Sequence, residues 1–378
     1  MAAAAIAGAA IDFGARATWA GLNETQFATH WDAYVGSGEL RARCPKVGIG
    51  YFYYPSLGRK LRGAMAKAPI AKGERLCEMP VGSLLSTFSV GNSTLRPVMD
   101  AVEAEASAPV ETSVDKQRGD GRKRKKVRAT DKRAFMCLLV LREAARARSA
   151  MMPYISVLLS HDVSGVPMTW GPNSDRLHRA TPALRAMAAL SRASTLRNYE
   201  AVVPLALSRF GHLLSEGLDC AGAGATASCS REQLERIYSR EEFLRVFAIF
   251  AARDWVLPMY GKARAFCVPI IDMFNFGQVG IRAEFDERAH AFVATATQPI
   301  KAGTELLFYY GTMCRESWIV MYGFAPREAR PCREPTKPGE TGKLGALKAV
   351  GGSASKANGK ASAKASAKAS AKAMLQQG

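Results

Sequence analysis

Segments with a strand-forming pattern lie at both ends of this sequence, and a long stretch with helical periodicity separates them. The first run, from Val47 to about Pro80, is rich in β-branched and aromatic residues and is punctuated by turns. Strand patterns return near the other end, over 265–271, 281–285, 290–296 and 305–309. A sheet built from these segments draws strands from both ends of the chain, so we expect an α+β fold with a helical insertion.

The middle of the chain predicts several helices. Residues 135–148 carry one apolar stripe, and Thr181-Pro182 supplies an N-cap followed by a first-turn proline. A separate helix is expected over 201–214, with Pro204 in its opening turn. Residues 239–242, Ser-Arg-Glu-Glu, form a capping box that starts a helix with an apolar face.

The net charge of +19 is concentrated in two segments. Residues 116–133 contribute +8 and residues 328–378 contribute +7, so the remainder of the chain is nearly balanced. Neither segment interleaves aromatic residues with its cations, which argues against stacking on single-stranded bases. A nucleic-acid or chromatin binder that uses only these two segments remains an alternative, and a cationic run of this kind can also direct a protein to the nucleus.

The eight cysteines show no CxxC or CxC spacing, which argues against a structural zinc site, and we expect no metal. Cys137 and Cys267 lie in apolar runs, where thiols act as small hydrophobic side chains. We therefore expect a reducing compartment, the cytoplasm or the nucleus, with a plastid as the alternative. No apolar run reaches the ~18 residues of a membrane span, so no membrane partner is expected.

These patterns divide the chain into consecutive parts. We expect an N-terminal extension (1–45), the first half of a sheet domain (46–110), a basic surface loop (111–133), a helical insertion (134–260), the second half of the sheet domain (261–326) and a disordered Lys/Ala/Ser tail (327–378). The end of the tail repeats lysine every four residues among alanines and serines, so it has almost nothing to bury.

Four segments combine glycine, aromatic and amide residues in a fixed order along the chain. They are 61–74, 268–276, 300–311 and 317–324. Taken together, their order and spacing resemble the SET-domain protein methyltransferases, over about Val47 to Pro326. The likeness is greatest to the branch that includes the Rubisco large-subunit lysine methyltransferase and the actin histidine methyltransferase. It implies a SET-type domain of short strands, split by a long helical insertion.

The resemblance implies a role for each matching residue. Tyr310, in a Gly-x-Glu-x5-Tyr-Gly stretch, matches the tyrosine beside which a methyl group passes from S-adenosylmethionine to the acceptor. Asn275 matches an asparagine that holds this cofactor, and Gly63 a glycine that lets the backbone approach it. The implied cofactor-binding residues are Arg62, Gly63, Arg253, Asn275, Phe276, Tyr310 and Phe324, and the implied substrate-binding residues are Arg253, Trp255, Asp272 and Tyr322.

Two positions depart from the family pattern, because Phe276 stands where the family has histidine and Leu61 where it has glycine. Trp255 and Tyr322 resemble the lysine-modifying relatives more than the histidine-modifying one. The resemblance therefore implies a monomeric, S-adenosylmethionine-dependent enzyme that methylates a side-chain nitrogen of a protein substrate, lysine in preference to histidine. A catalytically inactive SET-like binding or scaffold protein is the alternative.

The chemistry of methyl transfer suits these residue types. An in-line displacement at a sulfonium carbon depends on positioning and electrostatics, which aromatic faces and a tyrosyl oxygen supply. A lysine acceptor, with a reference pKa of ~10.4, must first lose a proton at a cost of ~4–5 kcal/mol near pH 7. No GxGxxG follows a strand and no P-loop is present, so a Rossmann-type methyltransferase is unsupported.

Overall fold

The computed structural model describes residues 43–55, 58–107, 130–146, 149, 151–218, 220, 229–277 and 280–332. The extension 1–45, the loop 111–133 and the tail 327–378 lie largely outside these ranges, so the expectations for them stay predictions. In the described ranges, no helix combines the length and the apolar character that crossing a membrane requires.

The chain divides into two compact units. Of the described residues, the sheet unit contains those from 43 to 84, from 253 to 318 and from 325 to 332, and the helical unit contains those from 85 to 252 and from 319 to 324. Helix α11 (Arg315–Tyr322) begins in the sheet unit and ends in the helical unit. The predicted domain boundaries stay predictions.

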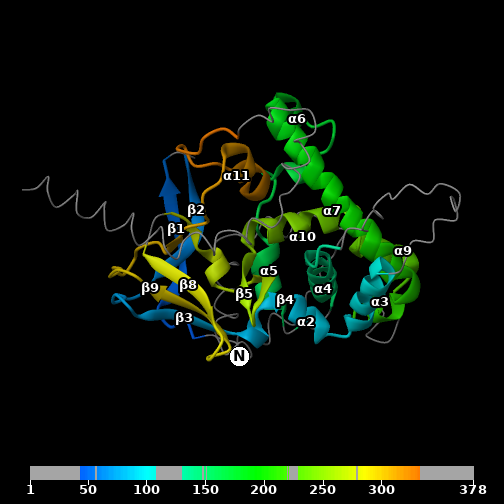
Figure 1. Cartoon of the computed structure of the whole chain (residues 1–378), viewed down its shortest axis with the longest axis horizontal. Coiled ribbons are helices and arrows are strands. Elements are labelled where there is room, and N and C mark those ends of the chain that lie inside the picture. Colours follow the sequence, from blue (N-terminus) through cyan, green and yellow to red (C-terminus); the bar gives the residue numbers. More distant parts are fainter. Residues whose placement is uncertain are drawn as a thin grey trace, which may run out of the picture. The chain divides into compact units, whose positions relative to one another are not determined.

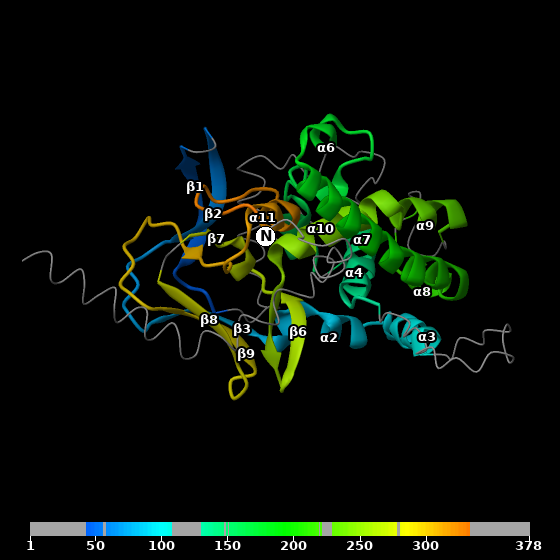
Figure 2. The same ribbon diagram turned by 45° about the horizontal axis from the view of Figure 1, so that its top comes forward.

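The sheet unit contains short strands from both ends of the sequence (Figures 1 and 2). Its elements are β1 (Val47–Tyr54), β2 (Arg59–Ala66), β3 (Arg75–Pro80), η3 (Val81–Ser83), β5 (Trp255–Met259), β6 (Lys262–Cys267), η5 (Ile271–Met273), β7 (Asn275–Phe276), β8 (Ile281–Asp286), β9 (Ala291–Ala296) and β10 (Leu307–Phe308). β1 pairs with β2 and β5 with β6 as antiparallel hairpins, whereas β7 and β10 are parallel.

The early and late halves of the sequence meet in one sheet of order β3-β9-β8. β3 pairs with β9 in an antiparallel register that places Met79 opposite Phe292, and both side chains are fully buried. β9 has the apolar, β-branched composition of a central strand, and most of its residues are buried. The prediction of a sheet assembled from both ends of the chain is therefore confirmed.

The segment before β10 runs along the edge of β2. Ala66 and Leu306 donate backbone hydrogen bonds to Thr304 and Ala64, at 3.0 and 2.8 Å, and Met65 forms a bridge with Glu305. This pairing brings Glu305, from the late half of the sequence, beside the centre of β2 in the early half.

The helical unit is built around one buried helix. Its elements are β4 (Leu85–Ser86), α2 (Thr87–Gly91), α3 (Arg96–Ser107), α4 (Arg133–Ala145), α5 (Met152–Leu159), η4 (Pro167–Thr169), α6 (Asp175–Arg179), α7 (Pro182–Arg209), α8 (Gly211–Ser215), α9 (Arg231–Ile237) and α10 (Arg240–Arg253). α4 contacts α2, α5, α7 and α9, and every residue after Arg133 is buried. The expected single apolar stripe on this helix is therefore wrong, because neighbours cover it on all sides.

The long helix α7 corrects a second expectation (Figure 1). It begins at Pro182 behind the Thr181 N-cap, as predicted, but it continues to Arg209 with Pro204 in its interior. A proline inside a helix removes one backbone hydrogen bond. Val202, Val203, Ala206 and Leu207 around it are buried, and this packing stabilises the helix through the proline.

The helix α10 keeps its predicted start. The Glu242 N–H donates to Ser239 Oγ at 3.4 Å, and Phe243, Val246, Phe247 and Phe250 are buried on the predicted face.

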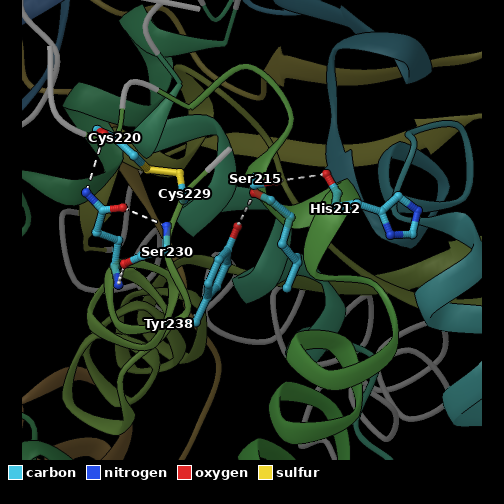
Figure 3. The surroundings of a disulfide bond; sticks show 8 residues. His212, Ser215, Cys220, Cys229, Ser230 and Tyr238 are labelled. Atoms are coloured by element: carbon cyan, nitrogen blue, oxygen red, sulfur yellow. Dashed lines mark hydrogen bonds between the residues drawn. A yellow bond between two sulfur atoms is a disulfide. The ribbon is translucent and has the colours of Figure 1, made fainter. Parts of the chain in front are cut away.

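Six of the eight cysteines are paired, whereas Cys137 and Cys267 are thiols buried in apolar surroundings, as predicted. The disulfides are Cys44–Cys77, Cys220–Cys229 and Cys314–Cys332. Figure 3 shows Cys220–Cys229 beside Ser230, the N-cap of α9, and near Tyr238, whose hydroxyl donates to the carbonyl of Leu214. Disulfides persist in oxidising surroundings, and the compartment stays a prediction.

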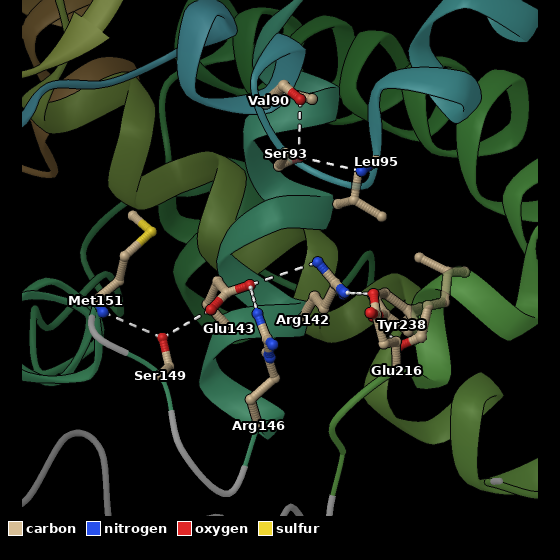
Figure 4. Close-up of polar contacts among 11 residues, drawn as sticks. Val90, Ser93, Leu95, Arg142, Glu143, Arg146, Ser149, Met151, Glu216 and Tyr238 are labelled. Carbon is tan, nitrogen blue, oxygen red and sulfur yellow. Dashed lines mark hydrogen bonds and ion pairs between the residues drawn. The ribbon is translucent and has the colours of Figure 1, made fainter. Parts of the chain in front are cut away.

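A group of buried charges joins α4 to the end of α8 (Figure 4). Arg142, 2 % exposed, pairs with Glu216 at 2.6 Å and with Glu143 at 3.6 Å. Glu143, 6 % exposed, also accepts hydrogen bonds from Arg146 and Ser149, at 3.0 and 2.7 Å. Its buried carboxylate thus contacts two guanidinium groups, of which that of Arg142 is also buried and that of Arg146 is partly exposed.

Replacing Glu143 by glutamine keeps the side-chain volume but leaves Arg142 and Arg146 short of one negative charge. We expect Glu143→Gln to lower the free energy of unfolding by about 3 kcal/mol, measured by urea denaturation. The matched change Glu235→Gln breaks an exposed pair with Arg231 and should cost no more than about 0.5 kcal/mol. Equal losses for the two variants would show that the buried carboxylate has no special role.

Candidate active site

Asn275 anchors the site through its carboxamide. It lies in β7, opposite Leu307 of the parallel strand β10, and it is partly exposed. Its Nδ2 donates to the carbonyl of Arg62 at 3.0 Å and to Glu305 Oε1 at 2.8 Å. Because both amide hydrogens are used within the protein, the oxygen Oδ1 is the polar atom left to accept a hydrogen bond from a ligand.

The phenol of Tyr310 lies next to this asparagine along the backbone. Its hydroxyl donates to the carbonyl of Phe274, the residue before Asn275, at 2.6 Å. Burial raises the pKa of the Tyr310 phenol above its ordinary value, while the nearby Arg253 charge opposes the shift. The phenol therefore stays protonated at neutral pH, with its hydrogen fixed on the Phe274 carbonyl and its oxygen lone pairs directed elsewhere.

A half-buried carboxylate, Glu305, joins β1 and β7 to the segment before β10. Its Oε1 accepts hydrogen bonds from Asn275 and from the hydroxyl of Tyr54, the latter at 2.9 Å. Burial raises the pKa of Glu305, and the two donors oppose that shift by stabilising the ionised form. Burial and then the neighbouring Glu305 charge also raise the pKa of Tyr54.

Gly63 provides the room for this hydrogen-bonded group. A Cβ atom at this position would lie 2.5 Å from Glu305 Oε1 and 2.7 Å from Asn275 Nδ2, which is closer than side-chain carbons approach other atoms. The predicted contact of Gly63 with a cofactor stays a prediction. The structure supplies a different reason for glycine here, namely the close approach of two polar side chains to β2.

Two guanidinium groups and one carboxylate lie around η5. Arg253, the last residue of α10, donates from Nη1 to the carbonyl of Asp272 at 2.6 Å. Burial, followed by the nearby charge of Arg253, lowers the pKa of Arg62 to about 9, so its guanidinium remains protonated at neutral pH. Asp272, 7 % exposed, opposes this effect. The charges of Arg62, Arg253 and Asp272 therefore act on one another around η5.

Aromatic rings cover one side of Tyr310. Phe276 lies edge to face with Tyr310 and with Trp318, at centroid distances of 5.7 and 4.7 Å. Trp318, 2 % exposed, is also nearly parallel to Tyr310 at 6.3 Å. Phe276, which departs from the family pattern, thus contributes a ring to the wall beside the phenol.

The remaining predicted residues lie in other clusters. Trp255 packs edge to face against Phe308 and Phe292, at 4.4 and 5.2 Å. Tyr322 and Phe324 belong to the helical unit, where their rings lie 6.1 Å apart, so their predicted places in the pocket stay predictions. The structure therefore brings together Arg62, Gly63, Arg253, Asp272, Asn275, Phe276 and Tyr310 in the sheet unit.

Sequence reasoning missed three participants. Glu305 belongs to the recognised segment 300–311, but the sequence does not predict that this segment lies next to β2. Tyr54 ends a run of strand-forming aromatics, and Trp318 is the fourth residue of α11, within the recognised segment 317–324. Neither carries a local signal that distinguishes a site residue from a core residue.

Comparisons with known proteins bear on the fold. No family model and no curated protein sequence matches the chain. Among solved structures, the SET domain of LSMT bound to lysine and AdoHcy matches with a TM-score of 0.52 and 12 % identity, over 81 % of this chain and 58 % of that chain. The same domain bound to MeLysine and AdoHcy matches with a TM-score of 0.51 and 13 % identity, over 81 % of this chain and 58 % of that chain. Rubisco LSMT bound to AdoMet matches with a TM-score of 0.51 and 12 % identity, over 80 % of this chain and 57 % of that chain.

These likenesses show that the chain has the fold of SET-domain methyltransferases. At 12–13 % identity they carry no more than the fold. The chain spans less than two thirds of the length of the solved structures that it matches.

A methyl group at residue 63 should disturb the site directly. We expect Gly63→Ala to displace Glu305 and Asn275 and to lower the free energy of unfolding by about 1–3 kcal/mol. Gly82→Ala is the matched control, because a Cβ there meets no atom within 4 Å, and its effect should stay within about 0.5 kcal/mol. Urea denaturation of the two variants tests this, and equal effects would contradict it.

The raised pKa of Glu305 gives a pH-dependent contribution to stability. The folded protein holds this proton more tightly than the unfolded chain, so the contribution is present at acid pH and is lost as pH rises through the raised pKa. Glu305→Gln cannot titrate, so its melting temperature should rise relative to the wild type from about pH 4 to about pH 7. Scanning fluorimetry measures the melting temperature of the variant minus that of the wild type. If this difference stays constant or falls as the pH rises, the raised pKa of Glu305 is contradicted.

Proposed function

We propose that this chain is an S-adenosylmethionine-dependent protein methyltransferase of the SET type, with a lysine side chain of a protein substrate as the acceptor. The observation that carries the proposal is the joint placement of Tyr310 and Asn275. The phenol is bound to the carbonyl that immediately precedes the asparagine, and the asparagine oxygen is available to a ligand. The SET fold supports this reading, and the matched structures contain AdoMet or AdoHcy.

The charges of the site suit the amino-acid part of S-adenosylmethionine. The Asn275 oxygen can accept a hydrogen bond from an ammonium group, because both amide hydrogens are donated within the protein. Arg62 and Arg253 are both cationic near Asp272, which suits a carboxylate. Gly63 lets the Asn275 carboxamide and the Glu305 carboxylate lie against β2, which fixes the orientation of the asparagine. S-adenosylmethionine, when bound, would supply the methyl group on a sulfonium.

Tyr310 acts by position and polarity. Its hydrogen points at the Phe274 carbonyl, so its oxygen presents lone pairs to a cationic methyl or ammonium group. Its raised pKa keeps it a neutral phenol, which is too weak a base to deprotonate lysine. The rings of Phe276 and Trp318 hold the phenol in place and exclude water from one side of it. The acceptor lysine therefore loses its proton to solvent before transfer.

Removing the Tyr310 hydroxyl should separate catalysis from binding. We expect Tyr310→Phe to lower the rate of methyl transfer by about 100-fold or more, with little change in S-adenosylmethionine affinity by calorimetry. Asn275→Ala should weaken that affinity by about 10- to 100-fold, because a charge-assisted hydrogen bond is lost. Tyr53→Phe, at an exposed tyrosine, is the control for the first variant.

The assay incubates a native lysate and each purified variant with labelled cofactor and maps the modified peptides. Absence of cofactor binding by the wild type would contradict the proposal. Binding without transfer would favour the alternative of a SET-like binding protein. A label on histidine would show that histidine, and not lysine, is the acceptor, and the proposed class of reaction would stand.

A further inference from the structure

The segment that follows Tyr310 folds back on itself in a way that the proposed reaction does not need. Cys314 and Cys332 are joined 18 residues apart, with their Cα atoms at 4.9 Å. Arg315 donates a backbone hydrogen bond to the carbonyl of Arg330 at 2.7 Å. These contacts fix the end of the described chain against the first turn of α11.

A carboxylate lies buried inside this loop. Glu316 is 7 % exposed, and its Oε2 accepts a hydrogen bond from the Cys332 N–H at 2.6 Å. In the described part of the chain, no lysine, arginine or histidine pairs with it. Burying a carboxylate is costly unless a cation or several donors compensate it. Glu316 also lies in the first turn of α11, where the helix N-terminus favours a carboxylate, and its carboxylate is an oxygen ligand available to a cation.

Two sulfur atoms stand where ligands of such a cation are needed. The ligand atoms of Cys314, Glu316 and Cys332 all lie within 4.8 Å of one another, and in the ranges that the structure describes no other three His, Cys, Asp or Glu side chains form such a group. Ser317 Oγ lies 3.2 Å from the sulfur of Cys314 and 3.8 Å from that of Cys332. Thiolate and carboxylate together are a ligand set that Zn²⁺ prefers over Ca²⁺ or Mg²⁺.

We propose that Cys314, Glu316 and Cys332 form a thiol-gated Zn²⁺ site. A dithiol reductant converts the disulfide into two cysteine thiols and is itself oxidised to a disulfide. Binding of Zn²⁺ then releases two protons, as two zinc–thiolate bonds form, and the Glu316 carboxylate supplies the third ligand. The Ser317 hydroxyl or a water molecule completes the tetrahedron. The inference does not depend on the proposed methyl transfer.

The site has a structural consequence at α11. The Trp318 N–H donates to the carbonyl of Cys314, and its ring packs on Phe276 and Tyr310. The disulfide and the zinc ion are therefore two ways to fix the same turn, and the reduced, metal-free chain lacks both.

The test uses the full chain, reduced with a phosphine that is then removed. Zn²⁺ is titrated against a chromophoric chelator, and Co²⁺ is used to detect thiolate-to-metal charge transfer. The reduced wild type should bind about one more equivalent of Zn²⁺ than Cys314→Ser/Cys332→Ser. Cys220→Ser/Cys229→Ser, which removes the disulfide of the helical unit, should bind as the wild type does.

Glu316→Gln keeps both thiols and the side-chain volume, so it serves even where the double variant fails to fold. It should weaken Zn²⁺ binding at least about tenfold, since loss of an outer-shell partner alone costs that much. Alkylation mapped by mass spectrometry should show Zn²⁺ protecting Cys314 and Cys332. Equal binding by the wild type, the double variant and Glu316→Gln would overturn the proposal, as would equal binding by the oxidised and reduced wild type.

Discussion

The hydrogen bonds to the Glu305 carboxylate hold the candidate site together. One oxygen accepts from Asn275 and Tyr54, so β1, β7 and the segment before β10 are fixed to one another through a single atom. The arrangement needs Gly63, since a side chain there would occupy the same space. The orientation of the Asn275 carboxamide, and thereby the polar atom that it presents, follows from this one constraint.

The fold was predictable because its signals are local and repeated. The apolar run of β9 and the Ser239 cap of α10 each follow from a few neighbouring residues. The prediction that a new helix begins near Pro204 was wrong, because the burial of residues around it in α7 outweighs the cost of a proline inside a helix. That burial depends on residues distant in the sequence. The same holds for the stripe expected on α4, since a helix covered on all sides need not alternate.

The site was predictable where motif order carried the information. Asn275, Gly63 and Tyr310 fall together because they belong to segments recognised by their spacing, whereas Tyr54 and Trp318 contribute through contacts that no spacing encodes. The cysteines make the same point. The absence of short CxxC spacings argued against a metal, yet Cys314 and Cys332 meet across 18 residues through the fold.

The link between Cys314 and Cys332 also determines where the rest of the chain departs. Cys314 follows Tyr310 by four positions, and the disulfide holds Cys332 beside Cys314, with their Cα atoms at 4.9 Å. The 46 residues after it include eight lysines. A tethered group is presented at an effective concentration set by its linker, often in the millimolar range. Under the proposed function, these lysines are rival acceptors, and label on the chain itself must be subtracted before a foreign substrate is assigned.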